Sequence, residues 1–70
     1  MSPLRAWRLA NGLSLQDVSD LSGISVSMIS RVERGQKRLS PLTKAKVARR
    51  LGVRIRDLFE VEEISEANVA

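Results

Sequence analysis

One segment, residues 14–35 with the sequence SLQDVSDLSGISVSMISRVERG, most restricts what this chain can fold into. Apolar residues recur at helical spacing over residues 15–22 and again over 26–34, on either side of Gly23. Each half follows a serine, Ser14 or Ser25, whose hydroxyl can accept a hydrogen bond from the free N–H groups of a first helical turn. Because the gap is too short for either helix to pack alone, the segment predicts a bent pair of helices joined by a tight turn.

The rest of the sequence predicts three further helices and no strand, so the expected fold class is all-α. The fold is then a compact five-helix bundle, in which the second and third helices form a helix-turn-helix whose second member is presented outward. Ser2-Pro3 and Ser40-Pro41 indicate the starts of the first and fourth helices, since proline at the first helical position gives up no hydrogen bond. We expect the first helix to end at residues 11–12, the fourth to end at 51–52, and a short fifth helix to cover 56–59.

Helical periodicity also predicts the core. Aromatic residues make up only 3% of the chain, so the core should be aliphatic, with Trp7 as its one large anchor. From the second helix to the fourth, the positions expected to face inward are Val18, Leu21, Ile24, Ile29, Val32, Leu42, Ala45, Ala48 and Leu51.

Charge is unevenly distributed along the chain. All 12 Lys and Arg lie in residues 1–56 beside three acidic residues, a net charge of +9, whereas residues 57–70 carry five acidic residues, a net charge of −5. We expect one domain over residues 1–60 and an acidic C-terminal tail over 61–70, whose weak pattern favours disorder. The basic domain indicates a polyanionic partner, although a merely solvated basic surface accounts for the charge equally well.

The composition argues against several classes of function. The chain has no Cys and no His, and therefore lacks the thiolate, the commonest metal ligand and the commonest general base. Its capping serines have no histidine to activate them, so we expect no enzyme activity, no metal and no cofactor. No apolar run approaches the roughly 18 residues that span a membrane, and we expect a soluble, cytoplasmic protein.

Several motifs agree in order and spacing with one known family. The stretch LSLQDVSDLSGISVSMISRVERG is followed by a basic loop, a helix that ends in LGV, and then DLF. Over residues 4–59 the chain resembles the phage-repressor-like (Cro/repressor, XRE-type) helix-turn-helix family. The resemblance implies a sequence-specific DNA-binding transcriptional regulator, and it favours a dimeric repressor that binds a two-fold symmetric operator in double-stranded DNA.

The resemblance assigns base readout to the third helix, through Val26, Ser27 and Arg31. The guanidinium of Arg31 can bind guanine O6 and N7 together, Val26 can pack on a thymine methyl, and Ser27 discriminates weakly. The alternative is that Arg31 contacts only phosphate. The residues expected to bind the DNA backbone are Ser14, Gln16, Arg34, Gln36, Lys37 and Arg38.

One position departs from the family pattern. Where the family often has a phosphate-binding glutamine at the first residue of the second helix, this chain has Leu15, and Gln16 is only a partial substitute. We therefore expect the basic loop after Gly35 to carry more of the DNA affinity than usual.

The resemblance also implies two structural pairings. Arg8 and Glu33 are expected to meet as a partly buried ion pair that fixes the angle of the third helix, the alternative being two independent surface charges. An apolar cluster after the fourth helix is expected to form the dimer interface, because a monomer would leave it partly exposed. Its residues are Val53, Ile55, Leu58 and Phe59.

Three points stay open at this stage. The basic side chains of the fourth helix are expected to be solvated, the alternative being that Lys44 alone approaches the DNA backbone. These side chains are Lys44, Lys46, Arg49 and Arg50. Asp17 and Asp20 are expected to serve the positive end of the second helix, and a contact with RNA polymerase is the alternative. The rival class of function is a protein-interaction module or an antitoxin-type partner binder that uses the same bundle.

Overall fold

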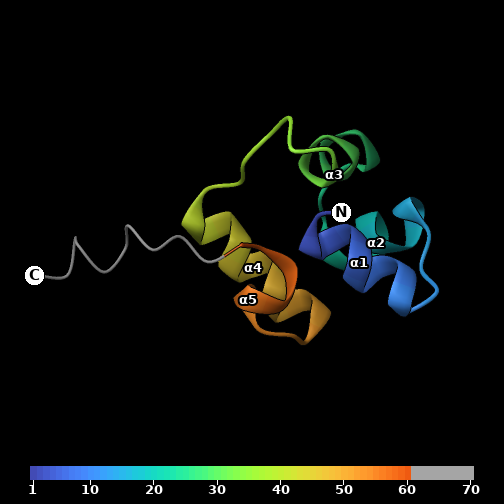
Figure 1. Cartoon of the computed structure of the whole chain (residues 1–70). Helices are drawn as coiled ribbons and strands as arrows, with labels where there is room; N and C mark the ends of the chain where they lie inside the picture. The colour runs from blue at the N-terminus through green and yellow to red at the C-terminus, as the bar shows by residue number, and fades with distance from the viewer. Residues whose placement is uncertain (61–70) are drawn as a thin grey trace, which may run out of the picture.

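A computed structural model of the chain describes residues 1–60, which form five α-helices and no strand. The helices are α1 (Pro3–Ala10), α2 (Leu15–Ser22), α3 (Val26–Glu33), α4 (Pro41–Leu51) and α5 (Ile55–Leu58). α2 packs against α3 and α4, and α1 packs against α3 and α5 (Figure 1). The expected all-α, five-helix fold is confirmed, whereas the acidic tail expected over 61–70 lies outside the described residues.

The first four helices begin directly after the serines that the sequence predicts as their N-caps. In each, the serine Oγ accepts a hydrogen bond of 3.0–3.2 Å from the backbone N–H three residues later. These caps are Ser2, Ser14, Ser25 and Ser40. Two helices differ slightly from the prediction. α3 ends at Glu33, with Arg34 as its C-cap, and α5 begins and ends one residue earlier than the expected 56–59.

The core lies between α1, α2, α4 and α5, with one side chain from α3. Its buried residues are Leu4, Val18, Ile29, Val47, Ala48, Leu58 and Phe59. Trp7 packs against this core but remains partly exposed, as do Ile24, Val32 and Leu51. Among residues 1–60, no helix combines the length and the apolar character that crossing a membrane requires.

Two of the expected core positions are wrong. Leu21 is 51% exposed and Leu42 is 66% exposed. In α2 the inward line passes through Val18 and Ser22 instead, and in α4 it includes Val47, which we had not predicted. Leu42 is five residues from Val47, or about 140° around the helix at about 100° per residue, so it points away from the core. Ala45 is only partly buried.

Candidate nucleic-acid interface

The outward face of α3 carries the predicted base-reading residues. Ser27 and Arg31 are exposed, and because they are four residues apart their side chains share one face of the helix. Val26, at the first helical position, is half-buried. α3 therefore presents a hydroxyl and a guanidinium on one exposed face, with a partly covered apolar side chain next to them.

An ion pair holds the C-terminal end of α3. Nε and Nη2 of Arg8 donate hydrogen bonds to Oε2 and Oε1 of Glu33 over 2.7 and 3.0 Å. The two side chains are only 12% and 5% exposed. Hydrogen bonding to Glu33 raises the pKa of Arg8, so the guanidinium stays charged. The ion pair expected from the sequence is present, and it joins α1 to α3.

The same guanidinium also reaches the start of α2. Nη1 of Arg8 donates a hydrogen bond of 3.0 Å to the carbonyl oxygen of Leu13, which directly precedes the N-cap of α2. One side chain of α1 therefore holds both the beginning of α2 and the end of α3. This arrangement fixes the helix-turn-helix relative to the rest of the bundle.

The two residues predicted to bind phosphate at α2 are both bonded to carboxylates. Oγ of Ser14 accepts from the N–H of Asp17, and the N–H of Ser14 donates to the Asp17 carboxylate, at 3.0 and 2.9 Å. Nε2 of Gln16 donates to Oδ1 of Asp20 at 2.9 Å. The backbone hydrogen bond from Ser14 lowers the pKa of Asp17. A phosphate that approached this end of α2 would meet two carboxylates as well as the helix N-terminus.

α3 ends in a left-handed turn at Gly35, and the basic loop starts from this turn. At Gly35 the backbone is left-handed, with φ of +74°, which glycine adopts without the strain that a side chain would cause. The N–H groups of Gly35 and Gln36 donate to the carbonyls of Val32 and Arg31 over 3.1 and 2.8 Å, the pattern of a Schellman motif. Nε of Arg34 donates to the carbonyl of Ser30 at 3.3 Å, so the Arg34 side chain lies along α3.

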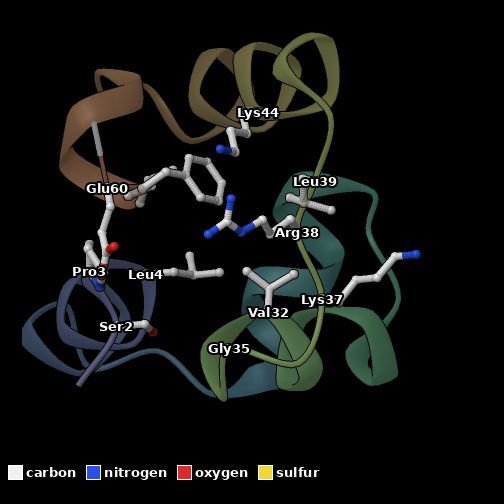
Figure 2. A pocket seen from close by; sticks show the side chains of 12 residues that line it. Ser2, Pro3, Leu4, Val32, Gly35, Lys37, Arg38, Leu39, Lys44 and Glu60 are labelled. Atoms are coloured by element: carbon white, nitrogen blue, oxygen red, sulfur yellow. The ribbon is translucent and has the colours of Figure 1, made fainter. Parts of the chain in front are cut away.

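The two basic side chains of the following loop point in different directions, as Figure 2 shows. Lys37 extends away from the neighbouring helices, whereas the guanidinium of Arg38 points between Leu4 and Lys44. It lies in a pocket of about 250 Å³ that is also lined by Glu60. In this conformation Lys37 is placed as the phosphate prediction requires, and Arg38 would have to turn outward to meet a phosphate.

Sequence analysis missed the contacts of two basic residues of α4. Nζ of Lys44 lies 5.6 Å from the centroid of the Phe59 ring, a cation–π distance. Nη1 of Arg50 donates a hydrogen bond of 3.3 Å to the carbonyl oxygen of Ser22, 28 residues earlier in the chain. Both contacts join residues that are far apart in the sequence, so no local pattern in the sequence could have indicated them.

Two of the four residues predicted to form the dimer interface are buried within the chain itself. Leu58 is 1% exposed and Phe59 is 7% exposed, because α5 packs against α1 and α4 within the same chain. Side chains that their own chain already covers have no surface left for a partner. Ile55 is 44% exposed and Val53 is half-buried, and both line an open groove between α4 and α5.

Comparison with known proteins gives one family. A family model described as helix-turn-helix matches residues 4–58, and no curated protein sequence matches the chain. The crystal structure of the restriction-modification controller protein C.AhdI from Aeromonas hydrophila is similar, with 40% sequence identity and a TM-score of 0.72. That similarity covers 81% of this chain and 86% of the controller protein. The expected XRE-type relationship is thus confirmed, and the chain belongs to the helix-turn-helix family of DNA-binding transcriptional regulators.

Proposed function

We propose that the chain is a dimeric repressor that reads the major groove of DNA with α3. The observation that carries this proposal is the exposed face of Ser27 and Arg31 on a helix whose end is fixed by the Arg8–Glu33 ion pair. An α-helix with its side chains is about 10–12 Å wide, which matches the roughly 12 Å width of the major groove. A rigidly held helix also keeps its side chains in register with the base edges.

Arg31 supplies most of the sequence specificity in this proposal. Its guanidinium can donate to O6 and N7 of one guanine, and a bidentate contact of this kind discriminates against other bases by about 1–3 kcal/mol. Ser27 contributes weakly, since a hydroxyl can donate or accept. Val26 offers its exposed part to a thymine methyl.

The basic loop supplies most of the affinity. Lys37, Gln36 and Arg34 are exposed next to the C-terminal end of α3, and Arg38 joins them when its side chain turns outward. The N-terminal end of α2 contributes less, because Ser14 and Gln16 there are bonded to Asp17 and Asp20. Each phosphate that a basic residue neutralises adds about −0.9 to the slope of log affinity against log salt concentration.

Two copies of the chain associate through the groove between α4 and α5, where Val53 and Ile55 offer apolar surface. α3 packs against α1 and α2, so an interface at α4 and α5 leaves its outward face available to DNA (Figure 1). In the helix-turn-helix dimers, two reading helices about 34–36 Å apart enter successive major grooves on one side of the duplex.

The similarity to C.AhdI supports a proposal for the controlled genes. At 40% identity over most of both chains, the restriction-modification controller supports the same role here, namely control of the transcription of restriction-modification genes. Occupancy of a promoter by the dimer suffices for repression, and DNA as the partner implies action in the cytoplasm. A contact of Asp17 or Asp20 with RNA polymerase stays the alternative to their role at the start of α2. An Asp20→Ala variant with unaltered DNA binding and unaltered transcription would refute it.

A salt titration tests the proposal. Binding to mixed-sequence duplex DNA is measured by fluorescence anisotropy between 50 and 200 mM salt, with Lys37→Ala and the exposed α4 variant Lys46→Ala as a matched pair. The affinity should fall steeply with salt, and Lys37→Ala should reduce the slope by about 1 while Lys46→Ala leaves it unchanged. Binding that is absent or insensitive to salt would refute the proposed DNA-binding surface and favour a protein partner.

A further inference from the structure

The turn between α2 and α3 is built differently from the other helix ends. α1, α3 and α4 each end in two reversed backbone hydrogen bonds. In α3, for example, these are the bonds from Gly35 and Gln36 described above. At α2, Gly23 donates to the carbonyl of Ser19 at 2.9 Å, but the next N–H, that of Ile24, is taken by Oγ of Ser22 at 3.2 Å.

This leaves the last carbonyls of α2 to be satisfied by other groups, since no intrahelical donor exists for them. The guanidinium of Arg50, in the last turn of α4, supplies one, because its Nη1 donates to the carbonyl oxygen of Ser22 at 3.3 Å. A positive charge next to the C-terminal end of a helix is also favourable, because the free carbonyls there carry partial negative charge.

Gly23 makes room for that arginine. Its φ of +79° is left-handed, which already favours glycine. A Cβ atom built at this position would collide with Nη1 of Arg50. The backbone conformation therefore favours glycine at position 23, and a side chain there would displace the Arg50 guanidinium from its place at the turn.

α2 is consequently held at both ends by arginines from outside the helix-turn-helix. Arg8 of α1 donates to the carbonyl of Leu13 just before α2, and Arg50 of α4 donates to the carbonyl of Ser22 at its end. Arg8 also anchors the far end of α3 through Glu33. Among the hydrogen bonds of residues 1–60 that join two helices, the bond from Arg50 is the only one that reaches the turn from which α3 starts.

We infer that Arg50 is a positioning residue for DNA recognition, which sets the direction of α3 by fixing the end of α2 and the turn at Gly23. The inference rests on the proposed function, in which α3 reads bases. Arg50 acts through the turn and does not touch DNA. Its loss should therefore reduce discrimination between sequences more than it reduces general attraction to the polyanion.

The experiment compares Arg50→Ala with Lys46→Ala, which removes the same charge from another exposed position of α4, outside the groove between α4 and α5. Two affinities are measured for each full-length variant. One is for a duplex that the unmodified chain selects from a random pool, and the other is for mixed-sequence DNA. The ratio of the two affinities should fall about tenfold in Arg50→Ala and stay unchanged in Lys46→Ala, since a hydrogen bond from a charged donor is lost only in the first. Arg50→Lys, which keeps one charged donor, should recover part of the ratio.

A second measurement does not depend on DNA. Backbone NMR shifts of Gly23 and Ile24 should change in Arg50→Ala and remain as in the unmodified chain in Lys46→Ala. If Arg50→Ala does not fold, the same two measurements on Arg50→Lys, with a smaller expected loss of the ratio, decide the matter. If the unmodified chain selects no preferred duplex, the proposed base readout fails, whereas the NMR comparison still tests the contact at the turn.

Two results would overturn the inference. Equal affinity ratios for Arg50→Ala and Lys46→Ala would show that only charge matters at these positions. A salt slope reduced by about 1 in Arg50→Ala but not in Lys46→Ala, with the affinity ratio unchanged, would show that Arg50 contacts a phosphate directly.

Discussion

Arg8 of α1 and Glu33 at the end of α3 are joined by two hydrogen bonds of 2.7 and 3.0 Å in a site from which water is largely excluded. Arg8 lies in the last turn of α1 and Glu33 is the last residue of α3, so the ion pair ties together the C-terminal ends of the two helices. α1 thereby supports α3, the helix that we propose reads DNA.

Removal of either partner of this ion pair should destabilise the fold. Glu33→Ala leaves the Arg8 guanidinium largely buried without its carboxylate, which should lower the free energy of unfolding by about 3 kcal/mol. The double variant Arg8→Met/Glu33→Leu leaves no charge behind and should be much closer to the unmodified chain. Urea unfolding followed by circular dichroism measures both, and single variants that each cost less than about 0.5 kcal/mol would contradict a buried ion pair.

The capping box of α2 should make stability depend on pH. The bonds from Ser14 lower the pKa of Asp17 below its ordinary value of 3.8. The stabilisation is therefore fully present above pH 3.8 and is lost as the pH falls through the lower pKa of the folded state. Thermal unfolding of the unmodified chain and of Asp17→Asn should accordingly differ at pH 6 and converge as the pH falls below the lowered pKa of Asp17. A difference that stays constant over this range would mean that the carboxylate charge plays no part.

Removal of a carboxylate beside the DNA-binding surface should strengthen DNA binding. Asp20→Asn keeps an oxygen that can accept the hydrogen bond from Gln16 but loses the negative charge near the start of α2. The affinity for DNA at low salt should rise about two- to fivefold, because a like charge near the phosphates is removed. Asp57→Asn changes the net charge equally on α5, and likewise keeps an oxygen that can accept a hydrogen bond, here from the N–H of Arg54, so it serves as the control. An equal rise in both variants would show that only the net charge matters.

The two apolar residues of α5 should respond differently to substitution. Leu58 is in the core, so Leu58→Ala should destabilise the fold by about 2–5 kcal/mol. Ile55 is 44% exposed in the groove, so Ile55→Ser should leave the fold intact but weaken the dimer. Sedimentation velocity combined with thermal unfolding separates the two effects. A dimer that survives Ile55→Ser unchanged would place the interface elsewhere.

Local chemistry explains why the helix boundaries could be predicted from the sequence. A serine cap such as Ser14 and a left-handed glycine such as Gly23 or Gly35 act within a few residues, and they lie where the sequence indicated. The ion pair of Arg8 and Glu33 was also expected, but from the family resemblance, since 25 residues separate the two side chains.

The errors arise where tertiary packing decides. Periodicity gives the spacing of apolar residues but leaves open which side of the helix meets the core. Leu21 and Leu42 were therefore expected in the core, although both lie on the exposed side of their helices. An apolar pair such as Leu58 and Phe59 can close the core of one chain or join two chains, and only the packing of α5 on α1 and α4 distinguishes these outcomes. The contact of Arg50 with Ser22 depends on the same long-range packing.

The most direct test of base reading by α3 is selection from a random duplex pool by the unmodified chain, by Arg31→Ala and by Arg34→Ala. The unmodified chain should select two symmetric half-sites, with centres separated by about 10 base pairs or a multiple of that, and each should contain a preferred guanine. Arg31→Ala should lose the preference at that one base pair and keep the others, whereas Arg34→Ala should keep all of them. If Arg31→Ala selects the same sequence as the unmodified chain, Arg31 does not read a base and the central claim is contradicted.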